Sequence, residues 1–306
     1  MGLEHVWLLL PDFALILIGY LVCHLTPLNR SVWQQVDALV YFFLFPTLLF
    51  HSIVRHPLDV SQASTLMLGG ALLGLGSIAL ALSLPYWPGL RGRLEPRLHA
   101  ASAQVAFRFN SFIALAVAQK LLGGEGLLLI AVIIGVCVPL FNVAAVYPMA
   151  KHVGRGLGRE LARNPLIWGT GLGLATNLLQ LAPPSWLEPT LGRIGQTGLV
   201  LGLMAAGAGM RLDALRQAPR LSAAVLGIRH LVTPLLAAAL VWLLGLQGAQ
   251  ATALLVFSSI PTASSCYVLA ARMGYDGPYV AGLVTLSTLL GMASLPLALT
   301  WLALAV

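Results

Sequence analysis

The sequence predicts an all-α membrane protein in which ten transmembrane helices form two inverted five-helix repeats, with helices 4 and 9 broken and crossing each other. Composition is the first observation behind this prediction. Of the 306 residues, 58% are hydrophobic and only 9% are charged, whereas a soluble protein of this size carries roughly 25% charged residues. The second observation is a pair of polar interruptions inside apolar segments, at residues 107–111 and 258–265. The third is that these interruptions fall at matching places in the two halves of the chain.

Ten apolar segments are long enough to cross a bilayer, since about 20 helical residues span its ~30 Å hydrocarbon core. Connectors rich in proline, glycine and arginine separate them. We expect the first segment to be a span, because Glu4 stands where a signal peptide carries cationic residues. The expected spans cover residues 6–25, 32–54, 63–84, 99–121, 127–149, 166–183, 190–210, 221–245, 251–271 and 279–303.

Positive charges are distributed unevenly among the connectors. The odd-numbered connectors contain 12 lysine and arginine residues, and the even-numbered ones contain 3. Cytoplasmic loops of membrane proteins carry the positive excess, so both termini are expected outside the cell. The net charge of +7 therefore reflects topology. The chain lacks the exposed basic patch with interleaved aromatic residues that nucleic-acid binding requires.

Breaks and prolines recur at offsets of 151 to 157 residues between the two halves. Because five spans is an odd number, a second copy of such a unit has to be inverted in the membrane. Inverted repeats with broken helices at the midplane are typical of secondary transporters. We expect residues 1–150 to form the first repeat and residues 164–306 the second. The matching positions are Pro11 with Pro165, Asn110 with Pro261, and Pro139 with Pro296.

The two interruptions are expected at similar depths. By helical rise, Asn110 lies about 18 Å along the fourth segment from its cytoplasmic end. Pro261 lies about 15 Å along the ninth segment from its outer end by the same rise. Both breaks therefore fall near the middle of the bilayer, approached from opposite sides.

A small organic anion is the expected ligand of these breaks. The half-helix after each break begins with unpaired N–H groups and a partial positive charge, which attract anions. Arg108 adds a full charge about 15 Å into its segment, and no acidic residue is buried in spans 3–5 or 8–10 to neutralise it. The predicted substrate-binding residues are Arg108, Asn110, Ser111, Phe112 and Asn142 in the first repeat, and Pro261, Thr262, Ala263, Ser264 and Ser265 in the second.

Structural roles compete with ligand binding for several of these residues. Pro261 can be a simple kink, and Ser264 and Ser265 can bond to their own helix backbone. Arg108 can pair with carbonyl groups freed at its break. Asn142 can either brace the break or contact substrate, and the sequence does not separate the two.

Polar residues elsewhere in the spans are given structural roles. Arg229 is expected to snorkel toward the cytoplasmic interface. Asp12 and Asp37 lie close to the starts of their spans and are expected to be interfacial caps. His51 and His230 titrate near neutral pH in water, but each is expected to be structural.

Metal, cofactor and enzyme chemistry find no support in the sequence. The three cysteines, Cys23, Cys137 and Cys266, lie at unrelated spacings in apolar segments and suggest neither a disulfide framework nor a metal site. No H-E-x-x-H or G-x-S-x-G motif occurs. We therefore expect no cofactor and no enzymatic activity, and an intramembrane serine–histidine enzyme is the alternative.

The sequence resembles the auxin efflux carrier family, within the bile acid/sodium symporter-like superfamily. The fourth span contains Arg108-x-Asn110-Ser111-Phe112-Ile113, which is similar to that family's R-x-N-x-G-F-I motif. The ninth span contains Pro261-Thr262-Ala263-Ser264-Ser265, which is similar to its second signature. The resemblance covers nearly the whole chain. One departure is Ala116, at a position where the family usually has proline.

The resemblance implies a carrier whose spans 4 and 9 cross at the substrate site. Spans 1, 2, 6 and 7 would form a scaffold that pairs in a homodimer, and spans 3–5 and 8–10 a transport domain that moves like an elevator. Family substrates are organic anions, namely auxin in plants and malate or malonate in bacterial members. The long cytoplasmic loop of plant members is absent, which favours a bacterial inner-membrane carboxylate carrier.

Efflux or uniport of a small carboxylate is the leading functional hypothesis. Cation exchangers of related architecture need a carboxylate at the crossing, and Asn110 occupies that place. Sodium- or proton-coupled symport is the alternative. A receptor that keeps the transporter fold but moves nothing also stays open.

Overall fold

The computed structural model describes residues 2–55, 64–152, 165–181, 183–209, 218–263 and 265–305. Nearly all of this described chain is helical, and no strand occurs in it. The predicted all-α class is therefore confirmed.

A helix, or a run of consecutive helices, occupies each of the ten segments expected to be spans. Three helical stretches in the described residues are long and apolar enough to cross a membrane: Ser64–Tyr86, Val132–Ala150 and Pro219–Leu244. The ten-span inverted repeat stays a prediction. The elements are α1 Gly2–Leu25, α2 Arg30–Leu39, η1 Val40–Leu44, α3 Phe45–Val54, α4 Ser64–Ser83, η2 Leu84–Tyr86, α5 Pro96–Phe107, α6 Ser111–His152, α8 Pro165–Leu178, α9 Glu188–Ala208, α10 Pro219–Gly227, η4 Ile228–Val232, α11 Thr233–Leu244, α12 Gly248–Ser259, α13 Ser265–Arg272 and α14 Gly277–Ala305.

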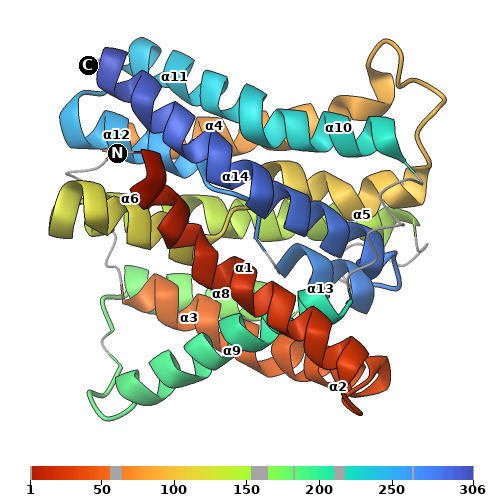
Figure 1. The fold of residues 1–306 in the computed structure, drawn as a ribbon. Helices are drawn as coiled ribbons and strands as arrows, with labels where there is room; N and C mark the ends of the chain where they lie inside the picture. The colour runs from red at the N-terminus through yellow and green to blue at the C-terminus, as the bar shows by residue number, and fades with distance from the viewer. Residues whose placement is uncertain are drawn as a thin grey trace.

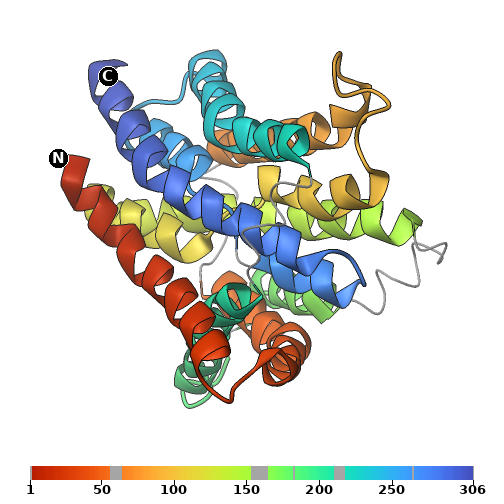
Figure 2. The ribbon, with the colours of Figure 1, turned by 45° about the vertical axis from the view of Figure 1, so that its right-hand side comes forward.

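The helices pack in two groups, which lie in the lower and upper parts of Figure 1. In the first group α1 packs against α9, and α3 packs against both α8 and α9. In the second group α4 contacts α5, α6 and α11, while α12 contacts α6 and α14. Helices α1 and α14 run side by side between the groups, and the start of α1 lies at the same end of the molecule as the end of α14 (Figures 1 and 2).

Two helical stretches contain a wider π-helical turn just before a proline. In η1 the N–H of Phe45 donates to the carbonyl of Val40, and Pro46 follows. In η4 the N–H of Thr233 donates to the carbonyl of Ile228, and Pro234 follows. Because proline has no N–H, it cannot continue the regular α-helical ladder. Such π-turns often occur at functional sites, and η4 lies beside the break between α12 and α13.

The long helix α6 consists of two helices that meet at Gly123. The backbone of Gly123 has φ +61° and ψ −142°, a conformation that is strained for any residue with a Cβ atom. The turn falls between the expected spans at 99–121 and 127–149. The predicted boundary between these two segments therefore coincides with a change in chain direction.

Candidate substrate site at the crossing of two broken helices

The first interruption separates α5 from α6. Helix α5 ends at Phe107, and Arg108 adopts an extended conformation with φ −73° and ψ 151°. Residues 108–110 are not helical, and α6 begins at Ser111. The chain then stays helical through Ala116. The break predicted in the fourth segment therefore lies at Arg108-Phe109-Asn110, without a proline.

The second interruption separates α12 from α13. Helix α12 ends at Ser259, and Ile260 is extended with φ −66° and ψ 138°. The following Pro261 has no N–H, so it cannot donate to the carbonyl of Phe257 as the fourth residue of a regular turn would. The helix resumes at Ser265. The break predicted in the ninth segment is therefore also present.

The two interruptions lie in direct contact. The N–H of Asn110 donates to the carbonyl oxygen of Pro261 at 2.9 Å. The rings of Phe109 and Phe257 pack edge to face, with their centroids 4.2 Å apart. Since a backbone hydrogen bond joins residues 151 positions apart in the chain, the sequence-based expectation that the breaks meet agrees with the structure.

Side chains and one backbone carbonyl near the breaks accept hydrogen bonds from backbone N–H groups. The Oδ1 atom of Asn110 accepts from the N–H of Ile113 at 3.3 Å, so Asn110 caps α6 in the manner of an N-cap residue. The N–H of Thr262 donates to Ser287 Oγ at 3.0 Å, and that of Cys266 donates to Ala263 O at 3.2 Å. The expectation that the amides after both breaks are unpaired is therefore wrong for these three groups.

Arg108 carries a buried charge at the crossing. Arg108 is 6% exposed, and its Nη1 atom has no hydrogen-bond partner in the described structure. Among the described residues of the second helix group, no aspartate or glutamate is buried. A buried arginine without compensation is costly in a protein interior. Arg108 is therefore the side chain at this site that most needs an anionic partner.

Arg229 corrects the expectation of a snorkelling side chain. It lies in η4 and is only 1% exposed. Its Nε atom donates to the carbonyl of Ile260 at 2.7 Å, and its Nη2 atom donates to the carbonyls of Phe257, at 3.2 Å, and Ile260. Pro261 deprives the Phe257 carbonyl of its normal helical donor, so the guanidinium replaces it. The pairing with freed carbonyls that was considered for Arg108 is thus made by Arg229.

The other predicted site residues differ in exposure. Asn110, Pro261 and Thr262 are buried, whereas Ser111, Ala263 and Ser265 are partly exposed. Asn142 is buried on α6, next to Phe141, whose ring centroid lies 5.9 Å from that of Phe109. The residues of the two breaks thus lie next to each other, and Asn142 directly follows a residue whose ring packs near Phe109. The side chain of Phe112 and the whole of Ser264 lie outside the described residues.

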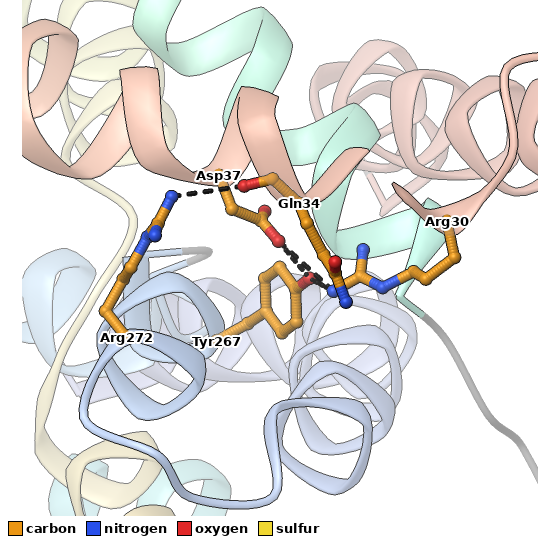
Figure 3. A network of polar contacts seen from close by, with 5 residues as sticks. All are labelled: Arg30, Gln34, Asp37, Tyr267 and Arg272. Atoms are coloured by element: carbon orange, nitrogen blue, oxygen red, sulfur yellow. Dashed lines mark hydrogen bonds and ion pairs between the residues drawn. The ribbon is translucent and has the colours of Figure 1, made fainter. Parts of the chain in front are cut away.

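A second polar cluster joins α2 to α13, as Figure 3 shows. Arg30 Nη2 forms an ion pair with Asp37 Oδ2 at 3.1 Å, and the hydroxyl of Tyr267 donates to the same oxygen at 2.9 Å. Arg30 Nη2 also contacts the Tyr267 hydroxyl. From the other side, Arg272 Nη2 donates to the carbonyl of Gln34 at 3.1 Å.

This cluster corrects the expectation that Asp37 is an interfacial cap. Asp37 is only 3% exposed, and the residue that caps α2 is Asn29, which accepts from the N–H of Ser31 at 3.0 Å. The side chain of Asp37 instead faces Tyr267, two residues into the half-helix that follows the second break. The sequence alone did not pair these elements, because the partners lie 230 residues apart.

No group of three or more His, Cys, Asp or Glu residues in the described part of the chain is arranged to hold a metal ion. Apolar helices, two interruptions in contact and a buried arginine whose Nη1 atom has no partner among the described residues are features expected of a membrane transporter.

The chain belongs to the family described as "Membrane transport protein", the auxin efflux carrier family, whose profile matches residues 94–299. The resemblance found in the sequence is therefore confirmed. Together with the apolar helices, this membership makes the chain an integral membrane protein. It also indicates a transporter rather than an enzyme.

Two similar proteins cover almost the full length of the chain. An "Uncharacterized transporter" of Methanothermobacter thermautotrophicus is 24% identical over 288 residues, which is 93% of this chain and 94% of that protein. A "Putative malonate transporter" of Rhizobium meliloti is 24% identical over 315 residues, which is 95% of this chain and 93% of that protein.

Proposed function

We propose that the protein is a carrier for small organic anions, which bind at the crossing of the two broken helices. The observation that carries this proposal is the buried Arg108, whose Nη1 atom has no partner among the described residues. A carboxylate bound there would supply the missing charge. Amide and hydroxyl groups of the two breaks would surround the carboxylate. The residues proposed to line this site are Asn110, Ser111, Phe112, Asn142 and the segment Pro261 to Ser265.

Two further features support an anion. The half-helices α6 and α13 begin at the crossing, and helix N-termini favour negative charge. The buried polar residues of the described second helix group include arginines, histidines, amides and hydroxyls but no carboxylate. The Rhizobium meliloti relative bears the name of a malonate transporter, so small carboxylates are the first substrates to test.

The proposal includes alternating access by an elevator movement. In it, α1, α2, α3, α8 and α9 form a scaffold that pairs with a second copy of the chain, and the remaining helices move with the bound anion. Most of the helix–helix contacts lie within one group or the other, which supports this division. The proposed topology has ten spans in two inverted repeats, with both termini outside the inner membrane of a bacterium.

We propose efflux or uniport as the mode of transport. Asn110 provides no titratable group at the crossing. The buried acid in the described chain, Asp37, is already paired with Arg30 and Tyr267 at the α2–α13 contact. Neither residue therefore offers an evident coupling site. Sodium- or proton-coupled symport is the outcome that the experiment below would reveal instead.

The test is uptake and counterflow of radiolabelled malate, malonate and an indole carboxylate in proteoliposomes, with and without sodium and pH gradients. We expect saturable uptake of at least one anion and counterflow that needs no gradient. Stimulation by a sodium or pH gradient would replace uniport with symport. Saturable binding of an anion without counterflow would identify a receptor, and absence of both binding and transport would contradict the proposal.

A further inference from the structure

Two neighbouring residues of the π-turn η4 are connected to the chain just before and just after Pro261. Consecutive side chains of a helical turn point in different directions, and Arg229 and His230 reach different partners. Arg229 donates to the carbonyls of Phe257 and Ile260, before Pro261. His230 faces α14, which packs against the segment after Pro261.

His230 is connected to the break through one serine. Its Nε2 atom lies 2.9 Å from Ser287 Oγ, and its Nδ1 atom lies 2.9 Å from Ser294 Oγ. Ser287 Oγ also accepts the N–H of Thr262 at 3.0 Å. A serine hydroxyl has one donor and two acceptor positions, so Ser287 can hold Thr262 and His230 together with either tautomer of the imidazole.

These contacts supply what the broken backbone lacks. Residues between two half-helices have no helical partners for their N–H and C=O groups, and Pro261 removes one more donor. Within a membrane, irregular backbone persists only where protein or water satisfies such groups. Arg229 donates hydrogen bonds to the carbonyls of Phe257 and Ile260, and Ser287 Oγ accepts one from the amide of Thr262.

We propose that η4 is the positioning element of the crossing: Arg229 and the His230–Ser287 pair fix the backbone at residues 260–262 and thereby aim the start of α13 at the ligand. Arg229, His230 and Ser287 act through the break and do not contact the anion themselves. The consequence for transport rests on the proposed function. The consequence for the backbone does not.

Two serines on α14 provide a matched pair of variants. Ser287→Ala removes a hydrogen bond to His230 and the acceptor of the Thr262 amide. Ser294→Ala also removes a hydrogen bond to His230 but leaves Thr262 paired. Any effect of loosening His230 alone is common to both variants, so the difference between them reports on Thr262.

The first measurement is hydrogen–deuterium exchange of peptides covering residues 258–268, which needs no ligand. We expect exchange at the Thr262 amide to be about ten times faster in Ser287→Ala and close to that of the unaltered protein in Ser294→Ala, because an unpaired buried donor opens more readily. Equal exchange in the two variants would overturn the proposal.

The second measurement is the concentration dependence of anion uptake in proteoliposomes. We expect Ser287→Ala to raise KM about tenfold, as for the loss of one aligned interaction, while Ser294→Ala changes it less than about twofold. Arg229→Lys keeps one donor group, so its KM should lie between that of the unaltered protein and that of Arg229→Met. A lower maximal rate with unchanged KM in Ser287→Ala would show a general packing defect and contradict positioning.

The two measurements separate this inference from the proposed function. If the unaltered protein transports no anion while Ser287→Ala alone accelerates exchange, the proposed function is wrong but the proposed positioning of the backbone is supported. If the unaltered protein transports an anion and the two serine variants behave alike, the positioning fails and the function stands.

Discussion

The backbone N–H of Asn110 donates to the carbonyl of Pro261 across 2.9 Å, so the two broken helices are joined at the residues that interrupt them. The same Asn110 caps α6 through its side chain, and Pro261 is the reason that α12 ends. The two breaks are therefore held together at this point.

Replacement of Asn110 separates its capping role from its role toward an anion. Asn110→Ala removes the cap of α6 and should lower the free energy of unfolding by about 1 kcal/mol. Asn110→Asp keeps an oxygen acceptor for the Ile113 amide but places a negative charge two residues from Arg108. We expect the aspartate variant to stay as stable as the unaltered protein and to raise KM for a carboxylate at least tenfold.

Thermal unfolding in detergent and uptake in proteoliposomes measure the two effects of Asn110. Unchanged KM in a well-folded Asn110→Asp protein would remove this residue from the surroundings of the ligand. A large loss of stability in Asn110→Asp would show that the amide nitrogen, rather than the oxygen, is the important group.

Arg108 should behave as a residue retained for function at a cost in stability. Arg108→Gln removes a buried charge with an unpaired Nη1 atom, so thermal stability should be unchanged or higher. The same change should reduce uptake at least tenfold, because the anion loses its charged partner. Arg108→Lys keeps the charge without the planar guanidinium, so its uptake should lie between that of the unaltered protein and that of Arg108→Gln.

The matched control for Arg108 is Arg193→Gln, an exposed arginine on α9, which should leave both stability and uptake unchanged. Stability and KM of the unaltered protein define the reference. A less stable Arg108→Gln protein with normal KM would assign Arg108 a structural role.

The placement of both breaks can be predicted from the sequence because the cause is local. Pro261 removes a backbone donor wherever it stands, and Asn110 with Ser111 offers a helix cap. The depth estimate places both breaks near the middle of the bilayer, and their crossing was implied by the family resemblance. The family motif adds to this inference at the same residues.

The roles of Arg229 and Asp37 were not predictable in the same way. Snorkelling and capping are the usual fates of charges near span ends, and only tertiary packing brings other partners within reach. One signal was present for Arg229, because a proline four residues after Phe257 leaves a carbonyl that some donor must satisfy. Nothing comparable pointed from Asp37 to Tyr267, whose pairing depends on how α13 lies against α2.

Gly291 allows α14 to approach the second break. A Cβ atom added at Gly291 would lie 3.0 to 3.2 Å from three ring carbons of Pro261, so alanine there must push the proline ring away. We expect Gly291→Ala to lower the unfolding temperature and to reduce uptake several-fold.

The control is Gly171→Ala on α8, where an added Cβ atom meets no other atom within 4 Å and alanine favours the helix by up to about 1 kcal/mol. Equal behaviour of the two variants would show that the Pro261 ring can move without consequence.

The cluster of Arg30, Asp37 and Tyr267 should act as one unit that holds α13 against α2. Tyr267→Phe removes the hydroxyl that donates to Asp37 and should cost about 1 kcal/mol in free energy of unfolding. Asp37→Asn leaves Arg30 without its carboxylate and should cost about 1 to 2 kcal/mol, less than a fully buried pair, because the Arg30 side chain is 35% exposed. Tyr267→Phe removes the donor of the hydrogen bond between Tyr267 and residue 37, and Asp37→Asn replaces its charged acceptor with a neutral one. Since both changes act on this one bond, the double variant should be less destabilised than the sum of the two. The measurement is a double-mutant cycle from reversible unfolding in mixed micelles, with Tyr86→Phe as the exposed control. Strict additivity would show that Tyr267 and Asp37 contribute separately.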